Sequence, residues 1–328
     1  MIKQASFASL AWDGKKKITK REQFLNEMNQ VVPWVELCAV IEPYYPKGEN
    51  GRPPKGLERM LRIHFTQQWY GLSDPGMEEA LYDSESIRRF CGIELMDDAI
   101  PDESTILQFR HLPEAHQLTE KFFAAVNAHL TRHRLLLRTG TMVDATLIAA
   151  PPSTKNEKRS RDPEMSQTKK GNTWHFGMKI HTGTDVDSGL VHTVKVTTAR
   201  VHDKKAMPDL LHGEERSVFG DKGYVSDEDK RTARANGVFW GVLDKAKPKK
   251  KLSAGQVKRN RQLSSVRAKV EHPFRVLKRQ FGYVKVRYKG LMKNTAQVLT
   301  LFALTNLYMA RRMLLAIREQ SVQQLQIA

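Results

Sequence analysis

The chain has 328 residues, of which 54 are lysine or arginine and 36 are aspartate or glutamate, so its formal net charge is +18. This excess favours an anionic partner, nucleic acid before a membrane surface. With only two cysteines, a disulfide framework and a four-cysteine zinc site are excluded, and a reducing cytoplasm fits. The longest apolar stretch, residues 298–309, is too short and too polar to span a bilayer, so we expect a buried helix and no membrane partner.

The first 135 residues have the patterns of an all-helical domain. Thr19 followed by Glu22 fits a capping box at a helix start. Leu57, Leu61 and Phe65 recur at helical spacing, and Gly71 is expected to end that helix. Helices are predicted at 19–29, from 33, at 57–70, from 74, from 84, at 103–112 and from 113.

The pattern changes at residue 135, where β-branched and alternating residues predict a strand over 135–151. Residues 153–173 are polar and predict an exposed loop, and 175–197 predict a hairpin that turns at 185–189. The remaining predictions are a helix at 204–211, a strand at 217–224, a helix at 227–236, a strand at 238–244 and an apolar helix at 295–318. Because sequential strands pair as a hairpin, we expect a mixed α/β sheet in a second domain, 136–328.

Two aspartates lie at or near the predicted strands. Asp144 has apolar neighbours in TMVDATLI, and a buried aspartate is costly unless it is paired or binds a metal. Asp221 ends a strand beside Gly220 and Gly223, at the kind of strand end where sites collect in open sheets. Each residue could instead be an ordinary strand-end or turn aspartate.

A third acid, Glu271, stands alone in the basic stretch 264–288. In a regular helix, Arg267 and Lys278 would share one face with it. A carboxylate between fixed cations suggests a metal ligand beside phosphates, whereas the alternative is a solvated helix with an Arg–Glu pair. Because Pro273 lacks an N–H, the helix must begin close to it, near position 272, or bend there.

Three carboxylates on rigid elements form the hard oxygen set that Mg²⁺ or Mn²⁺ prefers. Two such ions could activate an attacking oxygen and stabilise the leaving oxygen of a phosphodiester. Asp244 competes as the third ligand, but the cationic setting favours Glu271. Zinc is disfavoured, because the histidines lack HExxH spacing and cysteine partners.

Basic residues near these acids are candidate DNA contacts. The run 245–261 is expected to be a basic loop, in contact with phosphate or simply solvated. Trp174 opens the hairpin after a basic loop and could stack on a flipped or frayed base. The candidate DNA-binding residues are Arg267, Lys278, Arg275, Lys222, Lys249 and Lys250.

The ordered set of Asp144 in VDAT, Asp221 in DKGY, and Arg267-x3-Glu271-x6-Lys278 resembles the Asp-Asp-Glu (DDE) transposases of bacterial insertion sequences, and among them the insertion sequence five group. The stretches GRPP–LERML and PDESTILQFRH are also similar to that group's helical N-terminal domain. The resemblance implies an RNase H-like core, three metal-ligating carboxylates and two cations near DNA. One departure is Ser264, where the family pattern has a tyrosine.

We therefore expect a transposase that binds terminal inverted repeats and catalyses metal-dependent DNA cleavage and strand transfer. Its expected partners are Mg²⁺ (or Mn²⁺), element-end DNA, target DNA and further copies of itself, as a dimer or larger assembly. A cytoplasmic, nucleoid-associated location follows. The alternatives are a DNA-binding regulator with an inactive core, although none of the three carboxylates is lost, and a nuclease that cleaves without joining.

Overall fold

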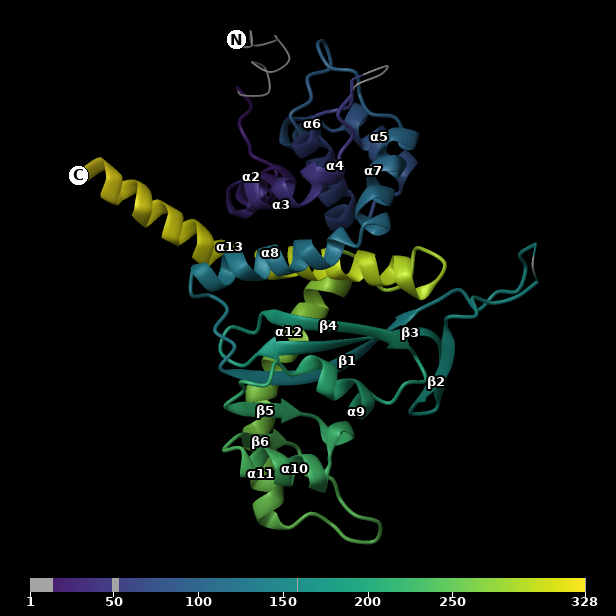
Figure 1. The fold of residues 1–328 in the computed structure, drawn as a ribbon, viewed down its shortest axis with the longest axis vertical. Coiled ribbons are helices and arrows are strands. Elements are labelled where there is room, and N and C mark those ends of the chain that lie inside the picture. The colour runs from purple at the N-terminus through teal and green to yellow at the C-terminus, as the bar shows by residue number, and fades with distance from the viewer. Residues whose placement is uncertain (1–13, 49–52, 158, 328) are drawn as a thin grey trace.

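The computed structural model describes residues 14–48, 53–157 and 159–327, and its N-terminal part is helical as predicted (Figure 1). Thr19 accepts the N–H of Glu22 where the first described helix begins, and Gly71 ends another with a left-handed φ of 67°. Pro113 lies inside a helix rather than before the next one. These helices are α2 (Lys20–Val31), α3 (Trp34–Ile41), α4 (Leu57–Tyr70), α5 (Asp74–Asp83), α6 (Glu85–Cys91), α7 (Glu103–Ala115) and α8 (Leu118–Arg132).

The rest of the chain is built on the predicted mixed sheet. Its strands are β1 (Gly140–Ala149), β2 (Ser166–Lys170), β3 (Thr173–Asp185), β4 (Val191–Thr198), β5 (Ser217–Gly220) and β6 (Phe239–Val242). β3 pairs antiparallel with β1, β2 and β4, whereas β5 pairs parallel with β1 and with β6. The predicted hairpin is β3–β4, and its turn is closed by Asp185, which accepts the N–H and the hydroxyl of Ser188.

Three further segments differ from their predictions. β2 lies within the predicted loop 153–173, because an exposed hairpin needs no apolar alternation. α11 (Ala254–Arg267) occupies the second half of the predicted loop 245–261, and its start is fixed by a capping box between Ser253 and Gln256. α13 (Leu291–Ile327) is longer than 295–318, since polar residues continue the helix past the apolar stretch.

Residues 254–280 form a helical run whose geometry changes along its length. After α11 come a 3-10 turn, 268–270, then α12 (Glu271–Arg275) and a π-helical turn, Val276–Gln280. Pro273 is the third residue of α12, whose start at Glu271 agrees with the predicted helix start near position 272, although α12 follows α11 through the 3-10 turn without a loop. In the 3-10 turn just before α12, the backbone hydrogen bonds depart from the α-helical pattern. This change comes next to Pro273, whose missing N–H would interrupt a regular α-helix.

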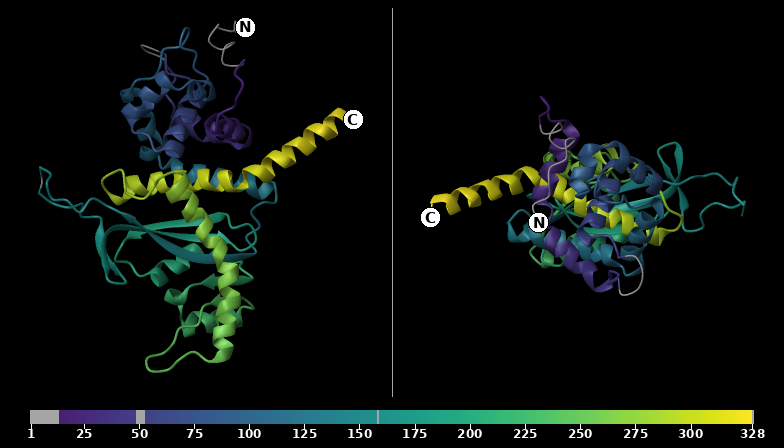
Figure 2. Two further views of the ribbon diagram at one scale, coloured as in Figure 1. Left: turned by 180° about the vertical axis from the view of Figure 1, so that it is seen from behind. Right: turned by 90° about the horizontal axis from the view of Figure 1, so that it is seen from above.

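α13 crosses the molecule between the N-terminal helices and the sheet, alongside α8 (Figure 2). Asn306 of α13 donates to the carbonyl oxygen of Val191 at 2.7 Å and to Oδ1 of Asn127 at 2.9 Å, which joins α13, α8 and β4. α13 is long and apolar enough to cross a membrane, but 67% of its apolar window is buried within the fold. We therefore assign it as a core helix, as predicted.

Two further helices, α9 (Asp203–Ala206) and α10 (Asp227–Ala235), lie near β5 and β6, on the side of the sheet away from α13 (Figure 1). Val143 of β1 packs in a small core with Met207, Val218, Tyr224 and Trp240. Met142 of the same strand packs with Phe219, Leu263 and Val270 on the α11 side. Both faces of β1 are thus covered, and the strand is held rigidly.

Candidate active site

Asp144 lies in β1 with its carboxylate largely buried. Oδ1 accepts the N–H of Ala145 at 2.8 Å, and Oδ2 lies 3.6 Å from Nη2 of Arg267. Burial raises the pKa of Asp144 from 3.8 to about 6, against the opposing effects of the Ala145 N–H and the Arg267 cation. Asp144 is therefore buried beside a cation. Such pairing is one of the two conditions, the other being metal binding, under which a buried aspartate is not costly.

Asp221 follows β5 and comes next to Asp144 through the strand register. The parallel pairing places Met142 opposite Phe219; Asp144 stands two residues further along β1, and Asp221 stands two residues after Phe219, just past the end of β5. Oδ1 of Asp221 accepts the N–H of Gly223 at 2.7 Å. A Cβ atom at Gly223 would lie only 2.9 Å from that oxygen, so glycine lets the turn fold tightly around the carboxylate.

Glu271, the first residue of α12, belongs to the same neighbourhood. After burial, charge repulsion from Glu271 and from Asp221 contributes to the raised pKa of Asp144. Arg267 lies one helical turn before Glu271, and its cation is directed at Asp144. The predicted acids thus come together although they are up to 127 positions apart, and one of the predicted cations is among them.

Lys278, in the π-helical turn, is anchored on β1 close to these acids. Its Nζ donates to Oγ1 of Thr146 at 2.7 Å and to the carbonyl oxygen of Leu147 at 3.0 Å. Burial lowers the pKa of Lys278, and so does charge repulsion from Lys170, whereas Glu271 raises it. Lys278 therefore lies within electrostatic reach of both Glu271 and Lys170 of β2, a proximity that sequence reasoning did not foresee.

The donor set suits a hard divalent cation, because it consists of carboxylates without thiolate or imidazole. A bound cation would also relieve the repulsion that raises the pKa of Asp144. Among the described residues, no three His, Cys, Asp or Glu side chains are closed around one ion position. Backbone N–H groups and Arg267 hold the oxygens of Asp144 and Asp221, and the donor chemistry of these carboxylates fits a hard divalent cation.

Asp244, the competing third acid, has a different set of partners. Nη1 of Arg259 lies 2.9 Å from Oδ2 of Asp244, and the same guanidinium donates to the carbonyl oxygens of Trp240 and Val242. Asn260 accepts the backbone N–H of Asp244. Asp244 is therefore tied to α11, and part of the basic run predicted to meet phosphate, Arg259, is directed inward.

The other predicted DNA contacts are exposed. Lys222 directly follows Asp221, and Arg275 ends α12. Lys249 and Lys250 lie in the segment between β6 and α11. Their exposure leaves their cations available to an anionic partner, while their role in binding stays a prediction.

The strand histidines have structural hydrogen bonds. The Nε2 atom of His181 and Oγ1 of Thr197 are 2.9 Å apart, and Nε2 of His192 lies 3.1 Å from Oγ1 of Thr141. His202 accepts the N–H of Lys204 and caps α9. These bonds agree with the interpretation of strand-face histidines rather than a zinc site.

Tyr224 is a residue beside the acids that had no predicted role. It is buried at 1% exposure, and its hydroxyl has no hydrogen-bond partner within the described part of the chain. Burial raises its pKa, and the charges of Asp203, Asp144 and Asp221 raise it further. The DKGY motif thus places a phenol as well as a carboxylate at the acid cluster, which only the fold could reveal.

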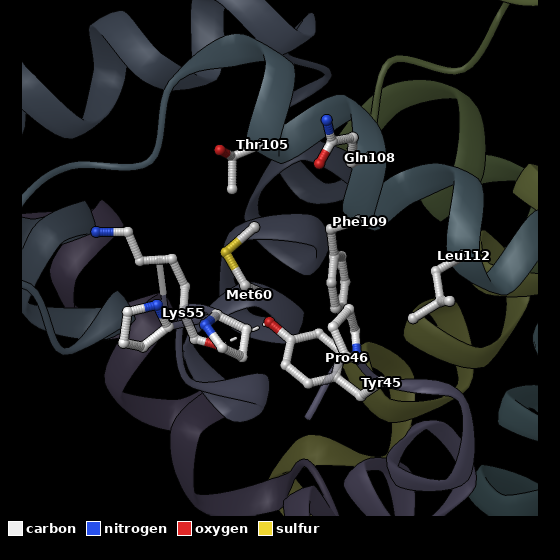
Figure 3. Close-up of a pocket in the computed structure, with 10 residues that line it drawn as sticks. Tyr45, Pro46, Lys55, Met60, Thr105, Gln108, Phe109 and Leu112 are labelled. Carbon is white, nitrogen blue, oxygen red and sulfur yellow. Dashed lines mark hydrogen bonds between the residues drawn. The ribbon is translucent and has the colours of Figure 1, made fainter. Parts of the chain in front are cut away.

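A separate pocket lies away from these acids. This pocket among the N-terminal helices is lined by residues of α4 and α7 and by Tyr45, whose hydroxyl donates to the carbonyl oxygen of Lys55 at 2.6 Å (Figure 3). None of the three carboxylates lines it. The clustered acids and their cations identify the candidate active site.

A mixed sheet that gathers carboxylates from β1, from the end of β5 and from a following helix defines an RNase H-like enzyme, in agreement with the predicted fold class. Residues 136–307 match the family described as "Transposase DDE domain", and residues 13–112 match "Transposase domain (DUF772)". The first match covers more than half of the chain, which therefore belongs to the DDE transposase family.

The prediction of a DDE-class transposase is thereby confirmed, and with it metal-dependent DNA cleavage and strand transfer in DNA transposition. Among solved structures, the chain is similar to a cryo-EM structure of the piggyBac transposase synaptic complex with hairpin DNA. That similarity has a TM-score of 0.47 at 9% identity, over 91% of this chain and 76% of that chain.

Proposed function

We propose that Asp144, Asp221 and Glu271 are the catalytic carboxylates of this transposase and that they hold its divalent cations. The observation that carries this proposal is the placement of the acids: the β1–β5 register sets Asp221 beside Asp144, and Arg267, one helical turn before Glu271, lies 3.6 Å from Asp144. Glu271 is preferred to Asp244, because Asp244 is engaged by Arg259 and Asn260.

The ion is Mg²⁺, with Mn²⁺ as a substitute, since both prefer carboxylate oxygens. When bound, it would activate the attacking oxygen and stabilise the leaving oxygen of a phosphodiester. Arg267 contacts a DNA phosphate next to the acids. The ammonium group of Lys278, which is held on β1, contacts the adjoining DNA strand. Lys222, Arg275, Lys249 and Lys250 contact the phosphate backbone further out and set the register of the DNA.

The order of the motifs supports membership of the insertion sequence five group. On this proposal, the helices within residues 1–135 bind the terminal inverted repeats, and residues 136–328 carry out catalysis. Two DNA ends must be held together, so the active form is a dimer or larger assembly on DNA. The protein acts in the cytoplasm on the nucleoid, in agreement with its two free cysteines, Cys38 and Cys91.

A cleavage assay on supercoiled plasmid carrying the ends of the element tests the proposal. We expect Mg²⁺-dependent nicking at the ends by the wild type, and loss of at least about 100-fold of the rate in Asp144→Asn and in Asp221→Asn. Both variants should still bind the DNA in chelator. If either variant keeps full cleavage, the assigned site is wrong, and end binding without any cleavage by the wild type would favour the regulator.

A further inference from the structure

The β2–β3 hairpin presents a tryptophan to solvent. Trp174 is 65% exposed, whereas Trp34, Trp69 and Trp240 are at most 9% exposed. It stands one residue into β3, after the two-residue turn Gly171–Asn172, in which Gly171 has a left-handed φ of 60°. A large indole that is exposed to solvent on a strand offers a surface on which a flat, apolar group can stack.

The charge around this indole is positive. Strand pairing places Lys169 directly opposite Trp174, and Lys170 opposite Thr173. Both lysines are exposed, and residues 166–178 include no aspartate or glutamate. Cations beside a stacking surface are the combination that binds single-stranded or unpaired nucleic acid, because the phosphates meet the cations and a base meets the ring.

The hairpin also continues the strand pair that carries the proposed catalytic acid. β1 pairs with β3 as far as Ala149 and Gly177, and the N–H of Ala150 donates to the carbonyl oxygen of Phe176 at 2.8 Å. The path along β1 from Asp144 to Ala149, and then along β3 from Gly177 to Trp174, covers about eight residues. Its length is about 26 Å. That distance corresponds to about eight base pairs of DNA.

We propose that the β2–β3 hairpin is a separate DNA contact, in which Trp174 stacks on an unpaired base and Lys169 and Lys170 contact the adjoining phosphates. The contact lies about eight nucleotides from the cleaved bond, a position that rests on the proposed catalytic role of Asp144. The hairpin would hold the cut strand away from its complement, and the stacking would be independent of the metal.

The test uses the full-length protein and element-end DNA carrying a single 2-aminopurine, placed in turn at positions four to twelve from the cleaved bond. In chelator, we expect the wild type to change the fluorescence most near position eight. Trp174→Ala should abolish this change and weaken binding about 10-fold, whereas Trp174→Phe should retain most of both. Phe239→Ala, which removes an aromatic ring 54% exposed at the start of β6, should leave both unchanged.

The inference is overturned if Trp174→Ala, folded by circular dichroism, gives the wild-type fluorescence profile and affinity. It is also overturned if Trp174→Ala changes the sedimentation of the protein without DNA, because the ring would then belong to a contact between copies. The Asp144→Asn variant separates the two proposals. If it still cleaves DNA, the catalytic assignment fails, while the fluorescence profile still decides the role of Trp174.

Discussion

The guanidinium of Arg267 lies 3.6 Å from the carboxylate of Asp144, at the end of α11 and in β1 respectively. Both side chains are largely shielded from solvent, so this pair is only weakly screened. Arg267 thus supplies positive charge to the acid cluster. The same cation would repel a divalent ion brought to Asp144, and this opposition can be measured.

Arg267→Gln is expected to bind Mn²⁺ about 10-fold more tightly than the wild type at pH 8, because a competing charge is removed beside a ligand. DNA cleavage by the same variant should fall, since a phosphate contact is lost. Calorimetric titration with Mn²⁺ measures the affinity, and Arg267→Lys, which keeps the charge, is the control. Weaker Mn²⁺ binding by Arg267→Gln would show that Arg267 supports the ligands instead of opposing the ion.

Asp144→Asn is expected to change how stability depends on pH in chelator. The folded pKa of Asp144 is raised from 3.8 to about 6, so its contribution to stability is fully present below about pH 4 and is lost as pH rises through about 6. Relative to the asparagine variant, the wild type should lose about 2–3 kcal/mol across that window and nothing more above it. Denaturant unfolding of both proteins at several pH values gives the difference, and a flat difference curve would contradict the shift.

Tyr224→Phe is expected to stabilise the metal-free protein. The hydroxyl of Tyr224 is buried without a hydrogen-bond partner among the described residues, and such a group costs about 1–3 kcal/mol. Tyr283→Phe is the matched control, because that equally buried tyrosine donates to Oδ1 of Asn294 at 3.3 Å. Thermal unfolding in chelator should therefore show opposite signs for the two variants, and a decrease in Tm for both would show that Tyr224 has a partner in solution.

Lys278→Met should weaken DNA binding without changing Mn²⁺ affinity more than a few-fold. Its Nζ is fixed on Thr146 and Leu147 of β1, so the cation has a defined position beside the acids. Loss of one phosphate contact should reduce the slope of log affinity against log salt by about one. Lys278→Arg keeps the charge and should keep the slope, and an unchanged slope in Lys278→Met would mean that Lys278 is purely structural.

Local sequence predicted the features that depend on nearby residues. The alternation around Asp144 gave β1, the hairpin turn followed from Asp185 and its neighbours, and the order of the acids indicated the chemistry. The helix around Glu271 was predicted less well. A periodicity of 100° assumes a regular α-helix, whereas the run there passes through 3-10, α and π geometry.

Contacts between segments far apart in the chain could not be predicted, because no local sequence pattern indicates them. Asn127 and Asn306 are 179 positions apart, and their hydrogen bond across α8 and α13 depends on the complete fold. The interaction of Lys170 with Lys278 depends on β2, a polar hairpin strand without apolar alternation. The role of Asp244 was equally hidden, because its partner Arg259 lies in a basic run that lacks an apolar stripe.

The most direct test of the central claim compares Glu271→Gln with Asp244→Asn in cleavage of the element's own ends, in Mg²⁺ and in chelator. Both changes remove one negative charge, but only Glu271 acts on Asp144, whereas Asp244 is paired with Arg259. We expect Glu271→Gln to lose Mg²⁺-dependent cleavage and Asp244→Asn to keep it within about 10-fold. Cleavage that survives Glu271→Gln and disappears in Asp244→Asn would contradict the proposed set of three carboxylates.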